Sequence, residues 1–230
     1  MPKVVHHLFK PDEKHLEQIE ESLLLSASDL AKDTAIENIE IEDIVNKAQV
    51  SPSTFYKVFH SVDGLFKKLG QRLTNELMEH VLSQTPEIAD VASRVAIKTR
   101  KGLLIATQSP FLASLGLKAG WPSSNPDDIL YKDIEKDFIE GVKQGYFTDI
   151  SPSIGVNIIL GCFRGGVRDI LEKKHTAEYA DKVIFQLLIS LGVDSKTADK
   201  VSKGSATDLP MPTKGLVSNV LSIQDRTKAD

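Results

Sequence analysis

Cysteine, tryptophan and long apolar runs are almost missing from this sequence. Its one cysteine, Cys162, cannot form an internal disulfide, which fits the reducing conditions of the cytoplasm. No apolar run approaches the roughly 20 residues of a membrane span. The first ten residues also lack the apolar core of a signal peptide. We therefore expect a cytoplasmic protein with no membrane partner.

Motifs for catalysis and metal binding are lacking as well. The sequence contains no P-loop, nucleophile elbow or dinucleotide fingerprint. Its six histidines show no ligand spacing with cysteine or carboxylates: His6, His7, His15, His60, His80 and His175. We expect no catalytic residues, no metal and no cofactor, and the protein is not expected to be an enzyme.

The sequence also lacks an overall excess of basic residues, since its formal net charge is −4. The charge is uneven, however. Residues 12–43 hold eleven acidic residues against two lysines, whereas residues 47–72 hold five basic residues against one aspartate. Because neutralised phosphates dominate nonspecific nucleic-acid affinity, the basic stretch is the expected footprint for such a partner. The acidic stretch is expected to face solvent away from it.

Residues 51–59 predict a short capped helix with an apolar back and a polar front. Ser51 can cap its start, and Pro52 suits the first helical position because no N–H is needed there. Phe55 and Phe59, four residues apart, would point inward. The polar residues left facing outward are Ser53, Thr54, Tyr56 and Lys57.

A second helix is expected immediately before it. Apolar residues at 41, 44, 45 and 48 repeat at helical spacing, and Gln49-Val50 leaves only a tight connection. Two short helices joined in this way make a helix-turn-helix, whose second helix lies in the DNA major groove.

Residues 44–66, IVNKAQVSPSTFYKVFHSVDGLF, resemble the DNA-binding domain of the TetR (tetracycline repressor) family of transcriptional regulators. The resemblance in motif covers about residues 14–82. It implies that base and phosphate contacts fall on Pro52, Ser53, Thr54, Tyr56 and Lys57. The basic stretch adds Lys47 and His60 to the expected DNA-binding residues.

Some positions depart from the family pattern. Val62 stands where relatives place a phosphate-contacting lysine, and Gln49 and Ser53 stand where glycine is common. Glu40 and Glu42 lie near the start of the helix before the turn, where a carboxylate can serve the helix dipole instead. These departures leave open an alternative, a TetR-like helical small-molecule-binding protein that has lost sequence-specific DNA binding.

The whole chain is expected to be all-α. A first helix is predicted over residues 14–32, and a fourth is predicted to begin near Asp63 and to end before Pro86. The expected domains are a helix-turn-helix DNA-binding domain over 1–70 linked by a helix at about 63–82, a helical effector-binding and dimerisation domain over 83–204, and a tail over 205–230. In the tail, a docked short helix and a mobile segment are both compatible with the sequence.

The two most apolar long helices are predicted to start at Ser151-Pro152 and at about Thr176. We expect them to pair with their copies in a homodimer, which the resemblance also implies. The residues assigned to this interface are Gly161, Gly165, Val183, Leu187 and Leu191. Packing within one chain is the alternative for the glycines. A dimer would present two recognition helices to a palindromic operator of double-stranded DNA.

The resemblance further implies a small-molecule effector that releases a repressor from its operator. Apolar candidates for its site are Phe111, Leu115, Trp121, Tyr131, Phe138 and Phe163, and ordinary core packing is the alternative for these residues. The polar candidates are Asn157, Arg164 and Arg168, which could pair with a carboxylate on the ligand or form interface salt bridges.

Overall fold

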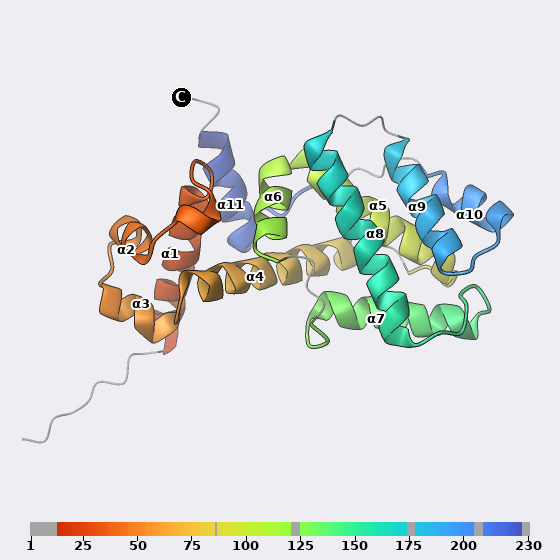
Figure 1. Ribbon diagram of the computed structural model, residues 1–230, viewed down its shortest axis with the longest axis horizontal. Helices are drawn as coiled ribbons and strands as arrows, with labels where there is room; N and C mark the ends of the chain where they lie inside the picture. The colour runs from red at the N-terminus through yellow and green to blue at the C-terminus, as the bar shows by residue number, and fades with distance from the viewer. Residues whose placement is uncertain (1–12, 86, 121–124, 174–177, 205–208, 227–230) are drawn as a thin grey trace, which may run out of the picture. The chain divides into compact units, whose positions relative to one another are not determined.

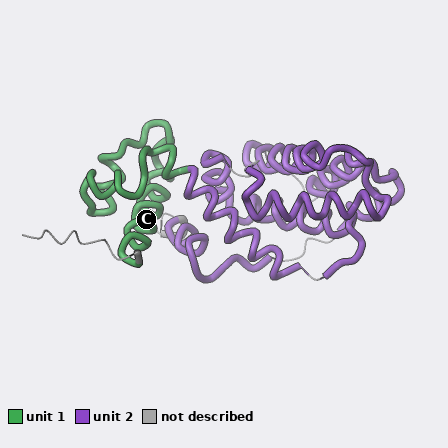
Figure 2. The backbone as a smooth tube through the Cα atoms, turned by 90° about the horizontal axis from the view of Figure 1, so that it is seen from below, with its two compact units in different colours: residues 1–66 green, residues 67–230 purple. Residues whose placement is uncertain are grey.

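The computed structural model describes residues 13–85, 87–120, 125–173, 178–204 and 209–226. Regular structure within these residues is entirely helical (Figure 1). The all-α prediction is therefore confirmed. The chain divides into two compact units, unit 1 over residues 1–66 and unit 2 over residues 67–230 (Figure 2).

Unit 1 is a small helical cluster. Its elements are α1 (Glu13–Leu30), a 3-10 turn (Ile36–Asn38), α2 (Ile41–Ala48), α3 (Pro52–Val58) and the first residues of α4 (Val62–Ser83). Helices α1, α2 and α3 contact one another in pairs. Their core is formed by side chains that are fully removed from solvent, among them Leu23, Leu24, Ile44, Phe55 and Leu65.

The turn between α2 and α3 is built as the sequence predicts, but at a conformational cost. Ser51 Oγ accepts a hydrogen bond from the Thr54 amide at 3.1 Å, and Pro52 is the first residue of α3. Gln49 closes α2 in the left-handed region, with φ 56°. Without the freedom of glycine, that backbone costs about 1 kcal/mol.

Unit 2 contains the rest of α4 and seven further helices among the described residues. These are α5 (Val91–Gln108), α6 (Pro110–Lys118), α7 (Ile129–Lys143), α8 (Pro152–Glu172), α9 (Tyr179–Ser190), α10 (Ser195–Ser202) and α11 (Gly215–Arg226). Helix α8 contacts α5, α6, α7 and α9, and α5 contacts α6, α7, α8, α9 and α10, so most of the packing in this bundle involves α5 and α8 (Figure 1). Pro152 opens α8, as predicted.

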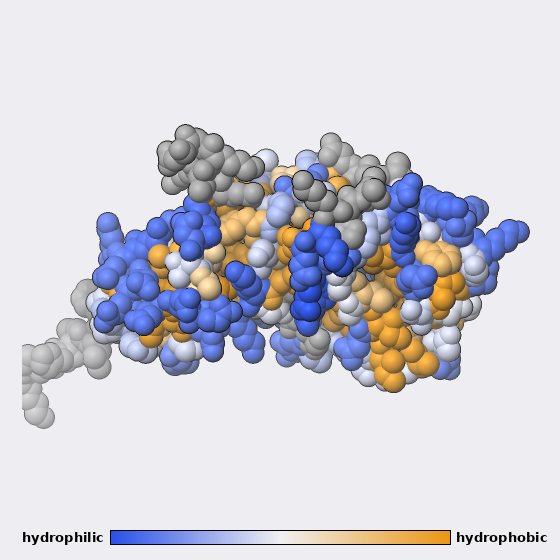
Figure 3. All heavy atoms as spheres, turned by 45° about the horizontal axis from the view of Figure 1, so that its top comes forward, coloured by the Kyte–Doolittle hydropathy of each residue, from blue (hydrophilic) through white to orange (hydrophobic). Residues whose placement is uncertain are grey.

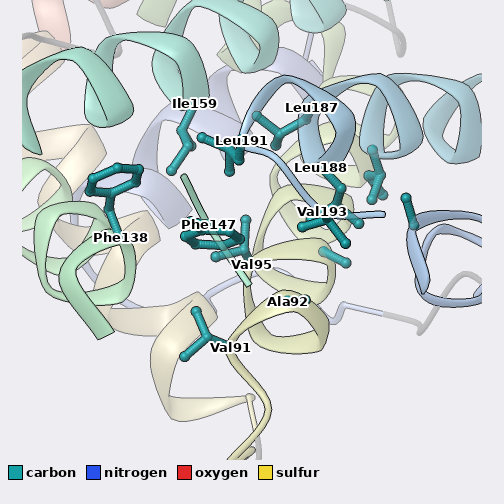
Figure 4. Packing of buried hydrophobic residues seen from close by; sticks show 13 residues of the cluster. Val91, Ala92, Val95, Phe138, Phe147, Ile159, Leu187, Leu188, Leu191 and Val193 are labelled. Carbon is teal, nitrogen blue, oxygen red and sulfur yellow. The ribbon is translucent and has the colours of Figure 1, made fainter. Parts of the chain in front are cut away.

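The main core of unit 2 lies between α5, α8 and α9. Val95 of α5, Ile159 of α8 and Leu187 of α9 converge there with Phe147 from the loop after α7 (Figure 4). The rings of Phe138 and Phe147 stack with their centroids 5.9 Å apart. Burial of large apolar side chains of this kind supplies most of the stability of a helical bundle.

The C-terminal region contains one helix that the sequence did not predict and a tail whose two possible states the structure distinguishes. Helix α10 was not predicted, and Asp194 caps it by accepting from the amides of Lys196 and Thr197 at 3.1 and 3.0 Å. Of the two possibilities for the tail, the structure shows the docked helix. In α11, Leu216, Val217 and Val220 are buried, and the helix contacts α6.

Candidate nucleic-acid interface and ligand cavity

The outer surface of α3 is polar and open to solvent. Four of its residues are exposed: Pro52, Ser53, Tyr56 and Lys57. Thr54 is half-buried. Tyr56 keeps 53% of its surface exposed although its ring meets that of Phe55 edge-on, with centroids 5.7 Å apart. The chain thus anchors α3 through buried phenylalanines and leaves its hydroxyls and one amine outward.

Three hydroxyls at the start of α3 form a local network. Ser51 Oγ lies 2.8 Å from both Ser53 Oγ and Thr54 Oγ1. Each hydroxyl has one donor and two acceptor sites, so a hydroxyl that is bonded inside this network can still accept from an outside donor or turn its own proton outward. Such a group suits contacts to phosphate oxygens and to base edges alike.

Lys47, at the last turn of α2, is engaged within unit 1. Its ammonium forms an ion pair with Asp29 of α1, and Lys32 pairs with the same carboxylate at 3.1 Å. Burial would raise the pKa of Asp29, but the hydrogen bonds from the two lysines outweigh it and lower the pKa. His60, by contrast, is exposed.

Two of the departures from the family pattern, Glu40 and Val62, lie at the starts of helices. Asp43 accepts from the Glu40 amide at 3.0 Å, so the acidic start of α2 satisfies a free backbone donor. Val62 is the first residue of α4 and is half-buried, and the start of that helix is capped by Ser61 Oγ, which accepts from the Gly64 amide at 3.0 Å.

Unit 2 contains a cavity of about 70 Å³. Side chains from α4, α5, α7 and α8 line it, including Leu77, Met78, Ile105, Leu130 and Phe163. Its wall is almost entirely apolar. Gly102 of α5 lies directly behind the Phe163 ring, because a Cβ at that position would come within 2.5 Å of the ring. The glycine therefore lets the ring take its place in the wall.

One end of this cavity is charged. Lys98 of α5 and the two aspartates Asp133 and Asp137 of α7 lie in its wall. Lys98 Nζ donates to Asp133 Oδ2 at 2.7 Å and to Asp137 Oδ2 at 2.8 Å, and Arg94 Nε donates to Asp137 Oδ1 at 2.9 Å. The same three wall residues border a more open, polar groove of about 600 Å³.

Of the residues assigned to the effector from the sequence, Phe163 lines the cavity. Leu115, Tyr131 and Phe138 are buried elsewhere in unit 2, and Phe111 and Arg164 are half-buried outside the cavity wall. Asn157 and Arg168 are exposed on α8, and Trp121 lies outside the described residues. Sequence reasoning missed Lys98, Asp133 and Asp137. Aspartates four residues apart on one helix were the available signal.

The residues assigned to dimerisation also divide into two groups. Gly161 and Gly165 are exposed on α8, with open space where each Cβ would be. Leu187 and Leu191 are buried in the chain's own core, so they have no surface to offer a partner, and Val183 is half-buried against the α5–α8 packing.

Hydrophobic residues do reach the surface of unit 2 on the face drawn in Figure 3, and Ile154 of α8 is 53% exposed.

Among the residues that the structure describes, no group of three or more histidine, cysteine or carboxylate side chains is arranged to hold a metal. Within the same ranges, no helix combines the length and apolar character needed to cross a membrane. Cys162 is half-buried, and burial raises the pKa of its thiol.

No protein-family model and no curated protein matches the chain. Solved structures do. RolR in complex with resorcinol is 16% identical, with a TM-score of 0.65 over 86% of this chain and 100% of that one. A TetR-family transcription regulator from Shewanella sp. PV-4 has 14% identity and a TM-score of 0.60, over 76% of this chain and 99% of its own.

A further similar structure is that of the fatty acid degradation regulator FadR from Bacillus halodurans. It is 16% identical, with a TM-score of 0.57 over 76% of this chain and 97% of its own. The matches extend over nearly the full length of these proteins, and so they include both the helix-turn-helix and the helical body. The chain has the fold of the TetR-family transcriptional regulators.

Proposed function

We propose that the protein is a DNA-binding transcriptional regulator, a repressor that a small-molecule effector releases from a palindromic operator. The observation that carries this proposal is the outer surface of α3. Exposed Ser53, Tyr56 and Lys57 stand on a capped helix whose Phe55 and Phe59 are buried behind it. That arrangement supports entry of α3 into a major groove.

In this proposal the length of each α3 side chain decides which part of the DNA it contacts. The short side chains of Ser53 and Thr54 at the first turn let the helix approach base edges closely. Tyr56 and Lys57 reach further and meet the flanking phosphates, where Lys57 supplies a positive charge. His60 is exposed just after α3, and Lys47 must leave Asp29 to contribute.

The operator-binding form is proposed to be a homodimer. Gly161 and Gly165 leave a shallow, open strip on α8, and exposed Ile154 adds apolar surface on the same helix. Backbones of two copies can approach closely along such a strip. A two-fold pair of recognition helices about 34 to 36 Å apart would read an inverted repeat.

The effector is proposed to bind in the cavity of unit 2. Helix α4 supplies Thr74, Leu77, Met78 and Val81 to its wall, and the same helix begins in unit 1. Occupancy can thereby bias the helix that leads to the DNA-binding unit. For release, the effector must bind the DNA-incompetent state more tightly, and DNA must weaken effector binding by the same factor. The resorcinol complex of RolR supports a small ligand in this fold.

The experiment is a fluorescence anisotropy titration with the duplex upstream of the protein's own gene, at several salt concentrations. Lys57→Ala should weaken binding and should reduce the slope of log K against log salt by about 0.9, the value for one phosphate contact. Lys132→Ala removes an exposed lysine of α7 and serves as the control. Absence of specific binding by the wild type would favour the alternative of a small-molecule-binding protein without DNA recognition.

A further inference from the structure

The C-terminal segment of unit 2, residues 209–226, packs back onto two much earlier helices, α4 and α6. Leu209 is 1% exposed, and α11 buries Leu216, Val217 and Val220. Helix α11 contacts α6. A helix as short as this one is only marginally stable on its own in water, so α11 depends on this docking for its structure. We refer to residues 209–226 as the strap.

Two polar side chains of α4, one turn apart, bind the strap. Glu76 accepts from the amides of Leu216 and Val217 at 2.9 and 3.1 Å. His80 Nε2 lies 2.5 Å from the carbonyl oxygen of Pro210. Because a carbonyl oxygen can only accept, this ring nitrogen carries the proton and donates it. The strap is thus bonded to α4 both ahead of α11 and at the first turn of that helix.

The strap and the cavity lie against different faces of α4. Glu76 and His80 are four residues apart and share one face of the helix. The residues that α4 contributes to the cavity wall follow the spacing i, i+3, i+4 and i+7: Thr74, Leu77, Met78 and Val81. At 3.6 residues per turn, the two faces are about 130° apart around the helix axis. A movement of α4 away from the cavity is therefore a movement against the strap.

Helix α4 is also in direct contact with the end of α6. A Cβ added at Gly70 of α4 would come within 2.8 Å of Ala119 Cβ and 2.9 Å of the Ala119 carbonyl oxygen. The strap contacts α6 and is bonded to α4 further along, so it makes a second connection between the same two helices. Any shift of α4 relative to α6 must strain or break that connection.

With the strap docked, the cavity is small. Its volume is about 70 Å³, whereas an apolar cavity that holds one benzene ring measures about 150 Å³. A ligand of even that size requires the wall to move outward. Of the four helices that line the cavity, α4 is the one that begins in unit 1. In a repressor that its effector releases, the form with the small cavity corresponds to the form that binds DNA.

We propose that the strap stabilises α4 in the small-cavity form and thereby opposes effector-driven release from DNA. This inference rests on the proposed function, because it names a control on the same regulatory cavity. While the strap is docked, outward movement of α4 also has to disrupt the bonds from Glu76 and His80. Loosening the strap therefore shifts the population toward the wide-cavity form and weakens operator binding, although no DNA-contacting residue has changed.

The first experiment measures hydrogen exchange by mass spectrometry on the full-length protein without DNA. Gly215→Ala changes only the strap, and its Cβ would come within 2.5 Å of Glu76 Oε1 at a backbone φ of +88°. We expect faster exchange in residues 209–226 and, by at least about two-fold, in residues 67–83 of α4. Faster exchange confined to residues 209–226 would overturn the inference.

A matched control separates this effect from general destabilisation. Asp194→Ala removes the side chain that caps α10, a helix of the same unit that packs on α5 and α9. The loss of one helix cap is comparable in size, but α4 should exchange at the wild-type rate. Acceleration of α4 to the same extent in both variants would contradict a specific role of the strap.

Glu76→Ala tests the same contact from the side of α4, and it carries the test if Gly215→Ala does not fold. It removes the acceptor of the Leu216 and Val217 amides. Alanine is the best helix former, so faster exchange in residues 67–83 of this variant cannot come from intrinsic helix propensity. Unchanged or slower exchange there would count against the strap.

The second experiment compares operator affinity by fluorescence anisotropy. Gly215→Ala and Glu76→Ala should each bind about two- to five-fold more weakly than the wild type, up to the factor expected for one lost helix cap. The slope of log K against log salt should stay the same, because no phosphate contact is removed. Asp194→Ala should bind like the wild type. Unchanged or tighter binding by both strap variants would overturn the inference.

Failure of this inference is separable from failure of the proposed function. Hydrogen exchange is measured on the protein alone, and wild-type operator binding is measured without any change to the strap. Coupled exchange of α4 and the strap in a chain that binds no specific DNA would keep the hold on α4 and reject the regulator. Equal operator binding by all variants would keep the regulator and reject the strap.

Discussion

At the residue scale, Asp29 decides how much of the basic charge of unit 1 is available to DNA. It holds Lys47 and Lys32 in ion pairs. Both groups of the Lys47 pair are partly exposed, with side-chain exposures of 40% and 31%, so the pair itself contributes well under about 1 kcal/mol to stability. Its larger consequence is electrostatic, because it keeps a lysine away from phosphate.

We therefore predict that Asp29→Asn strengthens nonspecific DNA binding. Freed Lys47 can add one phosphate contact, which steepens the salt slope by up to about 0.9. The control is Asp33→Asn, which removes the same charge at an exposed position of the same region. Anisotropy titrations of both variants distinguish release of Lys47 from a general change in net charge. Equal effects would mean that net charge alone matters and that Lys47 does not reach the backbone.

At the element scale, a carboxylate of α4 binds the N-terminus of the C-terminal helix α11. Glu76 Oε2 accepts from the Leu216 amide at 2.9 Å, and Glu76 Oε1 accepts from the Val217 amide at 3.1 Å. Gly215, with φ +88°, starts the helix and leaves no Cβ to collide with that carboxylate. An acidic group at a helix N-terminus satisfies free donors and favours the dipole.

Glu76→Ala should loosen α11. Loss of a cap costs about 1 kcal/mol, so amide exchange over residues 209–226 should accelerate about five-fold. Hydrogen exchange read by mass spectrometry measures this directly. Glu79→Ala, at an exposed site one turn further along α4, should leave exchange unchanged. Equal exchange in the two variants would show that apolar packing of Leu216 and Val220 alone holds the helix.

Helix starts could be predicted from the sequence, whereas the cavity could not. Local signals sufficed for α3 and α8, because Ser51-Pro52 and Ser151-Pro152 are start signals that act within one turn. The cavity could not be found in this way. Lys98 and Asp133 are 35 residues apart and meet only because α5 and α7 pack together. Of the aromatic candidates, Phe163 lines the cavity, whereas Tyr131 and Phe138 are buried outside its wall.

The apolar pattern of α9 shows a second limit. Its leucines predict burial correctly, but periodicity cannot say whether a helix is covered by its own chain or by a copy. The structure buries Leu187 and Leu191 within the chain. Helix α10, which supplies Ala198 to the same core, was missed because only two of its eight residues, Ala198 and Val201, are apolar.

At the scale of the whole molecule, the proposed dimer depends on the glycine strip of α8. Gly161→Leu should leave the protomer intact, because nothing lies within 4 Å of the added Cβ, yet it should prevent close approach of a second copy. We expect the dimer dissociation constant to rise at least about ten-fold, as loss of core packing at an interface implies. Gly161→Ala should give a smaller rise. Sedimentation equilibrium measures both, and an unchanged constant would place the interface elsewhere.

The proposed regulatory function depends on the exposed faces of two α3 helices, one from each copy, that read DNA together. Selection of bound duplexes from a random pool by the wild-type chain tests this most directly. We predict an enriched inverted repeat whose half-site centres are about one helical turn, 10 to 10.5 base pairs, or a multiple of it apart. Tyr56→Ala should relax or abolish the enrichment. A pool that shows no enriched sequence, or the same enrichment with Tyr56→Ala and Lys57→Ala together, would contradict it.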